Sequence, residues 1–311
     1  MKQNNVLVYG TGAVGIYFGG KLFQAGFNTV FVDIPAKVEL LSGQSLTIRS
    51  NISKNYNFSP KLVSDVSELP PQDLILVCVK AFQTYDIALN LLPIIKPDTI
   101  ILSLQNGLEN EKILSDLLGK NLLMGSVIYY NGILVDHSTV NQMAPGRVIF
   151  GELDHQSSKR EEWLSDVFSH ADINHQISRN ITFEIWKKFI WNNAYNSISA
   201  LTHTTLKQIQ MSEGIIPTIR QMMSEVKQVA EAEGIEIPKQ TLDELLTVKE
   251  EYSDVKPSML KDLESGQMPE LEALVGVVLK KAAKHGITVP VNQTVYNLIQ
   301  LSLMNSSLQS D

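Results

Sequence analysis

Short apolar runs alternate with helix-like segments in the first half of the chain. Compact apolar runs with turn signals beside them predict buried parallel strands. These runs are Val6–Tyr9, Val30–Asp33, Leu74–Val79 and Thr99–Ser103. Segments with helical spacing lie between them, at Ala13–Ala25 and Gln83–Ile95. The alternation is typical of an α/β fold with a doubly wound parallel sheet.

The remainder of the chain divides into a strand-rich part and a longer helical part. Further strands are predicted at Leu123–Tyr130, Thr139–Asn141 and Arg147–Gly151. After about Ile177 helical spacing prevails, over Ile181–Ala200, Glu213–Glu233, Pro257–Glu264, Leu271–Lys284 and Val291–Met304. Gly234, Gly266 and Gly286 predict breaks between these helices. The pattern therefore predicts an α/β domain over residues 1–178 and an all-helical domain over residues 179–311.

Composition and charge narrow the classes of partner. The 311 residues carry a net charge of −7 and contain no run of lysine or arginine, which argues against nucleic acid. No stretch reaches the roughly 20 apolar residues that a membrane-spanning helix needs. The six histidines lack the spacing of metal ligands. We therefore expect no nucleic acid, membrane or metal as a partner.

Cys78 is the single cysteine and lies inside the apolar run LILVCVK, which favours a core position over a reactive one. One cysteine cannot form an internal disulfide, and this fits a reducing cytoplasm. The N-terminal MKQNNVLVYG enters a strand at once, without a basic segment followed by a long apolar one, so we expect no export signal. A cytoplasmic location is the resulting expectation.

A glycine-rich loop follows the first predicted strand. The sequence GTGAVG, residues 10–15, is a G-x-G-x-x-G motif that opens an apolar helix. In such a loop the first glycine allows a tight turn, the second lets a pyrophosphate approach the backbone, and the third lets helix and strand pack closely. The helix N-terminus then offers free N–H groups to the phosphates. This context favours a Rossmann-type dinucleotide-binding domain over a purely structural turn. The predicted cofactor-binding residues are Gly10, Gly12, Ala13, Val14 and Gly15.

Asp33 ends the second predicted strand, FVD. A carboxylate at this place accepts hydrogen bonds from the adenosine ribose, and its charge opposes a 2′-phosphate. The rule favours NAD over NADP. Asp33 could instead face water or cap the turn before Pro35. The ammonium of Lys37 could also still hold a 2′-phosphate.

A polar stripe runs along the predicted helix that contains WKKFIWNNAYNSISA, residues 186–200. Because residues four apart lie nearly in line on a helix, Lys188, Asn192 and Asn196 form one column. Lys187 begins a different column. One ammonium and two amides can bind an anionic ligand that carries a carbonyl group. A solvated helix face is the alternative, although such a face normally carries more charges and fewer amides. The residues alone leave the two readings open.

The whole chain resembles the ketopantoate reductase (2-dehydropantoate 2-reductase) family, which includes NAD-dependent D-2-hydroxyacid dehydrogenases of the D-mandelate type. The order and spacing of several pieces carry the resemblance. These pieces are GTGAVG, VCVKAFQT from Val77, LQNGLEN from Leu104, WKKFIWNNAYN from Trp186 and PSMLKDLESGQMPELEALVG from Pro257.

The resemblance implies an active site with one lysine as general acid. Lys188 matches the family's catalytic lysine, and Glu270 matches a glutamate near that lysine and the substrate. Lys80 and Asn106 match residues that lie near the nicotinamide and the substrate. Taken singly, each of these residues also has a purely structural explanation, such as a strand end, a turn or a helix start.

The resemblance also implies the residues that bind the substrate. Asn192 and Asn196 match the family's substrate-binding asparagines, and Ser258 matches the serine that receives the substrate carboxylate. Ser258 could instead stabilise a helix N-terminus after Pro257.

Several positions depart from the family's pattern. Asp33 stands where many members have an arginine suited to NADP, which favours NAD here. Met268, Pro269 and Val275 replace residues common in the family. The loop LTHTTLK, from Leu201, lacks an asparagine that contacts the substrate's terminal hydroxyl in some members. This loss suggests a different bulky 2-oxo acid as substrate.

The implied reaction is hydride transfer from NAD(P)H to the C2 ketone of a C3-branched 2-oxo acid, giving the D-2-hydroxy acid. Examples are 2-dehydropantoate to pantoate and benzoylformate to D-mandelate. A non-catalytic NAD(P)-sensing protein and a β-hydroxyacid dehydrogenase of the 6-phosphogluconate type are the alternatives. The helical second domain leaves a homodimer open.

Overall fold

The protein is described by a computed structural model over residues 4–247 and 254–308. Its contacts form two compact units. The first unit consists of Met1–Gln105 and Glu109–Glu184, and the second consists of Asn106–Leu108 and Ile185–Asp311. The predicted division after residue 178 stays a prediction.

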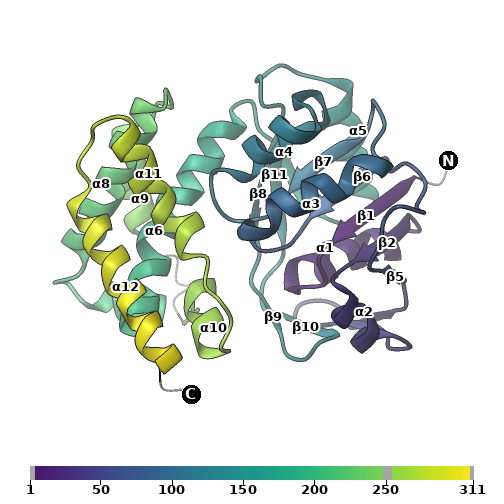
Figure 1. Ribbon diagram of the computed structural model, residues 1–311, viewed down its shortest axis with the longest axis horizontal. Helices are drawn as coiled ribbons and strands as arrows, with labels where there is room; N and C mark the ends of the chain where they lie inside the picture. The colour runs from purple at the N-terminus through teal and green to yellow at the C-terminus, as the bar shows by residue number, and fades with distance from the viewer. Residues whose placement is uncertain (1–3, 248–253, 309–311) are drawn as a thin grey trace. The chain divides into compact units, whose positions relative to one another are not determined.

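An eight-stranded sheet forms the centre of the first unit, in the order β12-β11-β8-β7-β6-β1-β2-β5 (Figure 1). Neighbours from β8 to β5 are all parallel. Numbered along the chain, these strands read 6-5-4-1-2-3, which is the Rossmann order. β11 joins β8 in antiparallel register, and β12 joins β11 in parallel. The strands are β1 (Asn5–Tyr9), β2 (Asn28–Val32), β5 (Lys61–Val63), β6 (Leu74–Val77), β7 (Ile100–Ser103), β8 (Leu123–Tyr129), β11 (Arg147–Gly151) and β12 (Asn174–Ile177).

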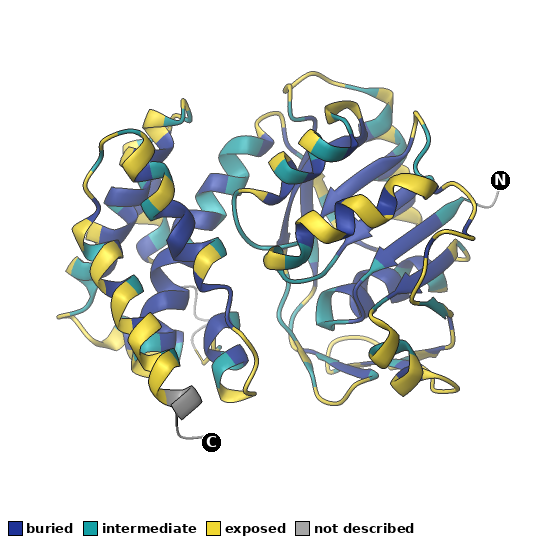
Figure 2. Ribbon diagram, viewed as in Figure 1, coloured by how far each residue is buried: buried dark blue, intermediate teal, exposed yellow. Residues whose placement is uncertain are grey.

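Helices cover both faces of this sheet, because its strands are apolar on both sides. Val6 and Val8 of β1 pack into one core with residues of α1 and α5. Leu7, between them, packs into the opposite core with residues of α3 and α4. Figure 2 shows these strands in the colour of buried residues. The helices are α1 (Ala13–Gln24), α2 (Pro35–Leu41), α3 (Thr84–Leu91), α4 (Asn110–Leu118) and α5 (Lys159–His170).

A smaller four-stranded sheet, ordered β4-β3-β10-β9, also belongs to the first unit. β3 (Leu46–Ser50) pairs in parallel with β10 (Thr139–Gln142), so the sheet joins distant parts of the chain. β4 (Tyr56–Phe58) and β9 (Gly132–Leu134) form its edges. The strand at β10 was predicted from the sequence, whereas β3 and β4 were not.

The second unit is helical in its described part, which confirms the predicted fold class of an α/β unit followed by helices. Its predicted breaks are also confirmed, because Gly234, Gly266 and Gly286 have φ values of +85°, +68° and +65°. Such left-handed residues end helices, and glycine adopts them without strain. The helices are α6 (Ile181–Thr202), α7 (Leu206–Met211), α8 (Ile216–Ala232), α9 (Lys239–Leu246), α10 (Ser258–Glu264), α11 (Val277–Lys284) and α12 (Pro290–Leu308). A π-helical turn, Glu272–Gly276, precedes α11.

Membrane-spanning helices and clusters of metal ligands are both absent from the described residues. No helix among them is long and apolar enough to cross a membrane. Within the same ranges, no group of three or more histidine, cysteine, aspartate or glutamate residues is arranged to hold a metal ion.

Candidate functional site

The glycine loop connects β1 to α1 in a conformation that requires glycine at its ends. Gly10 has a φ of +107°, and its N–H donates to the Val32 carbonyl at 2.8 Å. A Cβ on Gly15 would lie 1.9 Å from the Gly10 carbonyl oxygen. A larger residue at Gly15 would therefore push the helix away from the loop, and one at Gly10 would be strained and would meet Val79 and the Cys78 backbone. Cys78 packs against this loop and is partly buried, and desolvation raises the pKa of its thiol.

Gly12 needs a different explanation, because nothing in the described residues crowds it. Its backbone is extended (φ −79°, ψ −176°), and no heavy atom beyond its chain neighbours lies within 4 Å of the place a Cβ would take. α1 begins at the next residue with no side-chain cap and no acidic residue in its first turn. Open space beside uncapped N–H groups fits the pyrophosphate of a dinucleotide.

Asp33 is hydrogen-bonded to the glycine loop. The Thr11 N–H and hydroxyl donate to its Oδ2 at 2.7 and 2.6 Å, and the Ile34 N–H donates to its Oδ1 at 2.8 Å. The carboxylate thus ties the end of β2 to the loop. Oδ2 already accepts two bonds, but Oδ1 accepts only one, so Oδ1 keeps capacity for a ribose hydroxyl. Sequence reasoning missed Thr11, since no local pattern pairs it with Asp33.

The loop, Asp33 and Lys80 follow the carboxyl ends of β1, β2 and β6, which are neighbouring parallel strands. They therefore gather at one edge of the sheet, where open α/β sheets bind ligands. The Lys80 carbonyl accepts from the Gln83 N–H at 3.0 Å, at the start of a short 3₁₀ turn.

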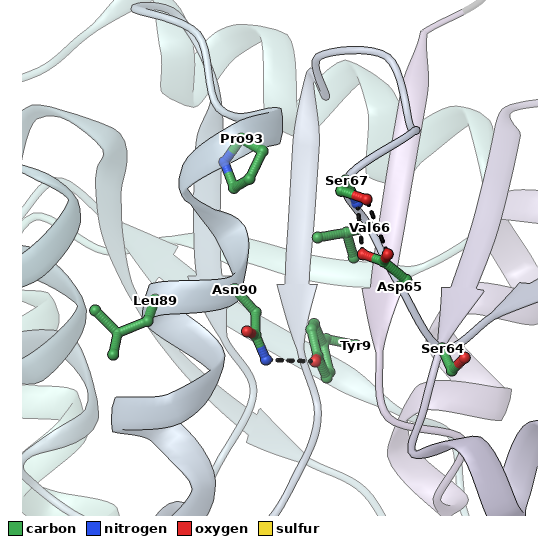
Figure 3. A pocket seen from close by; sticks show the side chains of 8 residues that line it. All are labelled: Tyr9, Ser64, Asp65, Val66, Ser67, Leu89, Asn90 and Pro93. Atoms are coloured by element: carbon green, nitrogen blue, oxygen red, sulfur yellow. Dashed lines mark hydrogen bonds between the residues drawn. The ribbon is translucent and has the colours of Figure 1, made fainter.

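A cavity of about 200 Å³ lies in the first unit, beside the end of β1, the segment after β5 and α3 (Figure 3). Asn90 Nδ2 donates to the Tyr9 hydroxyl at 3.4 Å across it. Hydrogen bonds from the Ser67 N–H and hydroxyl lower the pKa of Asp65. None of the predicted site residues lines this cavity. Its lining is Tyr9, Ser64, Asp65, Val66, Ser67, Leu89, Asn90 and Pro93.

The polar column of α6 meets Asn106, which belongs to the second unit although it follows β7 in the chain. Lys188 Nζ and Asn192 Nδ2 donate to the same oxygen, Asn106 Oδ1, at 3.1 and 3.4 Å. Further along the column, Asn196 Nδ2 donates to Ser258 Oγ at 3.5 Å. Asn192 and Asn196 are only 7% and 3% exposed, so the column is not a solvated face.

Lys187 lies on another side of α6. Its Nζ donates to Glu244 of α9 at 3.0 Å. Trp191, one turn on, stacks on Tyr195, whose hydroxyl donates to the Leu246 carbonyl at 2.9 Å. Lys187 therefore belongs to the packing of α6 on α9, and Lys188 to the polar column.

Glu270 lies just before the helical segment that continues into α11, and it is 7% exposed. Its carbonyl accepts from the Leu274 N–H at 3.0 Å. The predicted site residues of the second unit are thus carried by α6, the segment after β7, the start of α10 and the short segment before the π-helical turn. Sequence reasoning missed this turn, because a helical spacing pattern does not distinguish it from an α-helix.

Sequence comparison identifies the family to which this arrangement belongs. The profile described as "Ketopantoate reductase PanE/ApbA" matches residues 6–155, and that of "Ketopantoate reductase PanE/ApbA C terminal" matches residues 180–302. The chain belongs to the ketopantoate reductase family. It is accordingly an NAD(P)-dependent oxidoreductase.

Similar proteins cover nearly the whole chain. A 2-dehydropantoate 2-reductase of a Nostoc species is 27% identical in an alignment of 308 positions that covers 96% of this chain and 95% of the relative. The solved 2-dehydropantoate 2-reductase of Geobacter metallireducens is 28% identical and has a TM-score of 0.89, covering 96% of this chain and 99% of that one. A D-mandelate dehydrogenase solved with NADH and anilino(oxo)acetate is 22% identical, with a TM-score of 0.87 and coverage of 96% and 97%, and shows the same fold.

Proposed function

We propose that this enzyme reduces the C2 ketone of a bulky, C3-branched 2-oxo acid to the D-2-hydroxy acid. The observation that carries the proposal is the convergence of Lys188 and Asn192 on Asn106, with Asn196 and Ser258 paired further along the column. A partly buried ammonium beside buried amides and a hydroxyl suits a small anion with a carbonyl group. Membership in a reductase family argues against the non-catalytic sensor and the 6-phosphogluconate-type alternative.

The residues take complementary roles in this reaction. Reduced nicotinamide, when bound, supplies the hydride. Negative charge grows on the carbonyl oxygen, so Lys188 stabilises that oxygen and then donates the proton. Asn192 and Asn106 orient the lysine and the ketone, while Asn196 and Ser258 receive the carboxylate. For Glu270 we propose a place near this lysine, as the family resemblance implies.

For the cofactor we propose NAD rather than NADP. Asp33 supports this choice, because a carboxylate tied to Thr11 at the end of β2 would repel a 2′-phosphate. Gly10, Gly12, Ala13, Val14 and Gly15 would hold the pyrophosphate, and Lys80 would lie beside the nicotinamide.

Two classes of 2-oxo acid are candidates for the substrate, those with a terminal hydroxyl and those without one. Relatives named 2-dehydropantoate 2-reductase favour 2-dehydropantoate. The loop after α6 instead favours an acid without a terminal hydroxyl. The segment LTHTTLK has no side-chain amide, and the hydroxyls of Thr202 and Thr204 are hydrogen-bonded to each other at 2.7 Å. Benzoylformate and branched aliphatic 2-oxo acids belong to this second class.

The direct test follows the absorbance of NADH and NADPH with 2-dehydropantoate, 2-oxoisovalerate, 2-oxoisocaproate and benzoylformate. We expect oxidation of NADH with at least one acid, and a preference for NADPH after Asp33→Arg. If neither NADH nor NADPH is oxidised with any of the four acids, the proposed reaction is refuted. A wild-type preference for NADPH would refute the cofactor assignment alone. The cytoplasmic location and a homodimer stay predictions, the latter open to light scattering on the purified protein.

A further inference from the structure

A buried amide adjoins the polar column without belonging to it. Asn193 follows Asn192 on α6 and is 0% exposed. Its Nδ2 donates to the backbone carbonyl of Leu274 at 2.9 Å. Its Oδ1 is buried and has no hydrogen-bond partner among the described residues. A leucine of similar size would avoid this unsatisfied oxygen, so packing by itself does not explain an asparagine here.

The carbonyl that Asn193 binds lies inside the π-helical turn Glu272–Gly276. There the Val277 N–H donates to the Glu272 carbonyl, five residues back instead of four. Such a turn holds one more residue than an α-helical turn, and one residue corresponds to about 100° of rotation. The turn therefore determines the direction in which the preceding residues point relative to α11.

Glu270 is connected to Asn193 through one residue. The N–H of Leu274 donates to the Glu270 carbonyl at 3.0 Å, while the carbonyl of Leu274 accepts from Asn193. Leu274 thus joins the segment that carries Glu270 to the helix that carries Lys188. Both ends of this connection lie in the second unit.

We infer, resting on the function proposed above, that Asn193 is a positioning residue for the reduction. Its hydrogen bond holds the π-helical turn against α6 and thereby fixes the position of Glu270 relative to Lys188. It touches neither substrate nor cofactor. Its loss should therefore change turnover more than substrate binding, because Asn196 and Ser258 remain in place to receive the carboxylate.

Asn292 provides a matched control in the same unit. It is also 0% exposed, its Nδ2 also donates to a helix carbonyl (Met222, 3.2 Å), and its Oδ1 also lacks a partner among the described residues. Unlike Asn193, it also donates from Nδ2 to a buried carboxylate, that of Glu225, at 2.8 Å. It holds α12 against α8, whereas α12 is linked to the π-helical turn by a separate bond, from the Tyr296 hydroxyl to the Glu272 carboxylate. If buried amides matter only for stability, the two asparagines should respond alike to replacement.

The experiment compares Asn193→Leu and Asn292→Leu in the full chain. Hydrogen exchange is measured over residues 270–278, and kcat and KM are measured for the best 2-oxo acid. For Asn193→Leu we expect at least about tenfold faster exchange in that segment, kcat lowered about tenfold and KM within about threefold of wild type. Asn193→Gln, which keeps an amide donor, should recover part of kcat. Asn292→Leu should change neither the exchange of this segment nor kcat.

Two results would overturn the inference while leaving the proposed function intact. One is a wild-type kcat for Asn193→Leu, whatever the rate of hydrogen exchange over residues 270–278. The other is an equal loss of kcat in both leucine variants. An inactive wild type would overturn the proposed function and this inference together. Should Asn193→Leu fail to fold, Asn193→Ser replaces it and is judged by the same outcomes.

Discussion

Two adjacent lysines show how strongly one residue's place on a helix decides its surroundings. Lys187 and Lys188 differ by about 100° around α6. The first binds the carboxylate of Glu244, and the second binds the amide oxygen of Asn106. Glu244 is 56% exposed at its side chain, so the Lys187 pair is a surface ion pair of little energetic weight. The chemistry should therefore depend on Lys188.

Replacement of each lysine by alanine tests this difference. Lys188→Ala should lower kcat by roughly 10²-fold or more, because a general acid and the charge beside the oxyanion are lost together. Lys187→Ala is the control and should leave kcat within about twofold. Steady-state rates with NADH and the preferred 2-oxo acid measure both. A larger loss for Lys187→Ala than for Lys188→Ala would mean that the proton donor is assigned to the wrong face of α6.

At the scale of elements, the sequence predicted those parts of the fold that local chemistry determines. The strands β1, β6 and β7 coincide with compact apolar runs, and the breaks at Gly234, Gly266 and Gly286 coincide with left-handed glycines. It missed β3 and β4, which pair with each other, and β3 also pairs with β10, far along the chain. Pairing over such distances depends on tertiary context, which local pattern does not contain.

The ends of α8 and α11 are joined by a charged cluster that gives the second unit a pH dependence. Glu233, at the end of α8, accepts hydrogen bonds from Lys281, Lys284 and His285 at the end of α11. Burial would raise the pKa of Glu233, but these bonds outweigh it and lower the pKa from its ordinary value of 4.5 to about 2. Cations here also suit the negative end of the α11 dipole.

The sign of the effect follows from this lowered pKa. Ionised Glu233 contributes its full stabilisation above pH 4.5, and the contribution is lost as the pH falls toward about 2. Glu233→Gln should therefore lower the free energy of unfolding at pH 7 and make it decline less between pH 4.5 and 2. Glu231→Gln is the matched control, because Glu231 forms only an exposed pair with Lys227 on the same helix. Urea unfolding at several pH values measures both, and parallel curves for the two variants would contradict the role of the cluster.

At the scale of the whole molecule, the predicted residues divide between the two units. The glycine loop, Asp33 and Lys80 belong to the first unit, whereas the polar column, Asn106 included, belongs to the second. The motif and the column were visible in the sequence, since each depends on local spacing. The bond between Lys188 and Asn106 was not, because it joins residues 82 positions apart. The same holds for the bonds of Thr11 to Asp33, which no spacing rule contains.

This division predicts that binding of NADH depends on the first unit and turnover on the second. NADH at about 100 times its Kd should stabilise the protein by about 2.7 kcal/mol, which a thermal shift of several degrees would report. Asp33→Asn should weaken NADH binding about tenfold, because it removes the charge that accepts from the Thr11 N–H and hydroxyl. Thr11→Val, which removes only the hydroxyl bond, should have a smaller effect. Lys188→Ala should leave the NADH-induced shift unchanged while abolishing most of the turnover. If Lys188→Ala removes the NADH shift as completely as Asp33→Asn does, cofactor binding is not confined to the first unit and the division of roles is wrong.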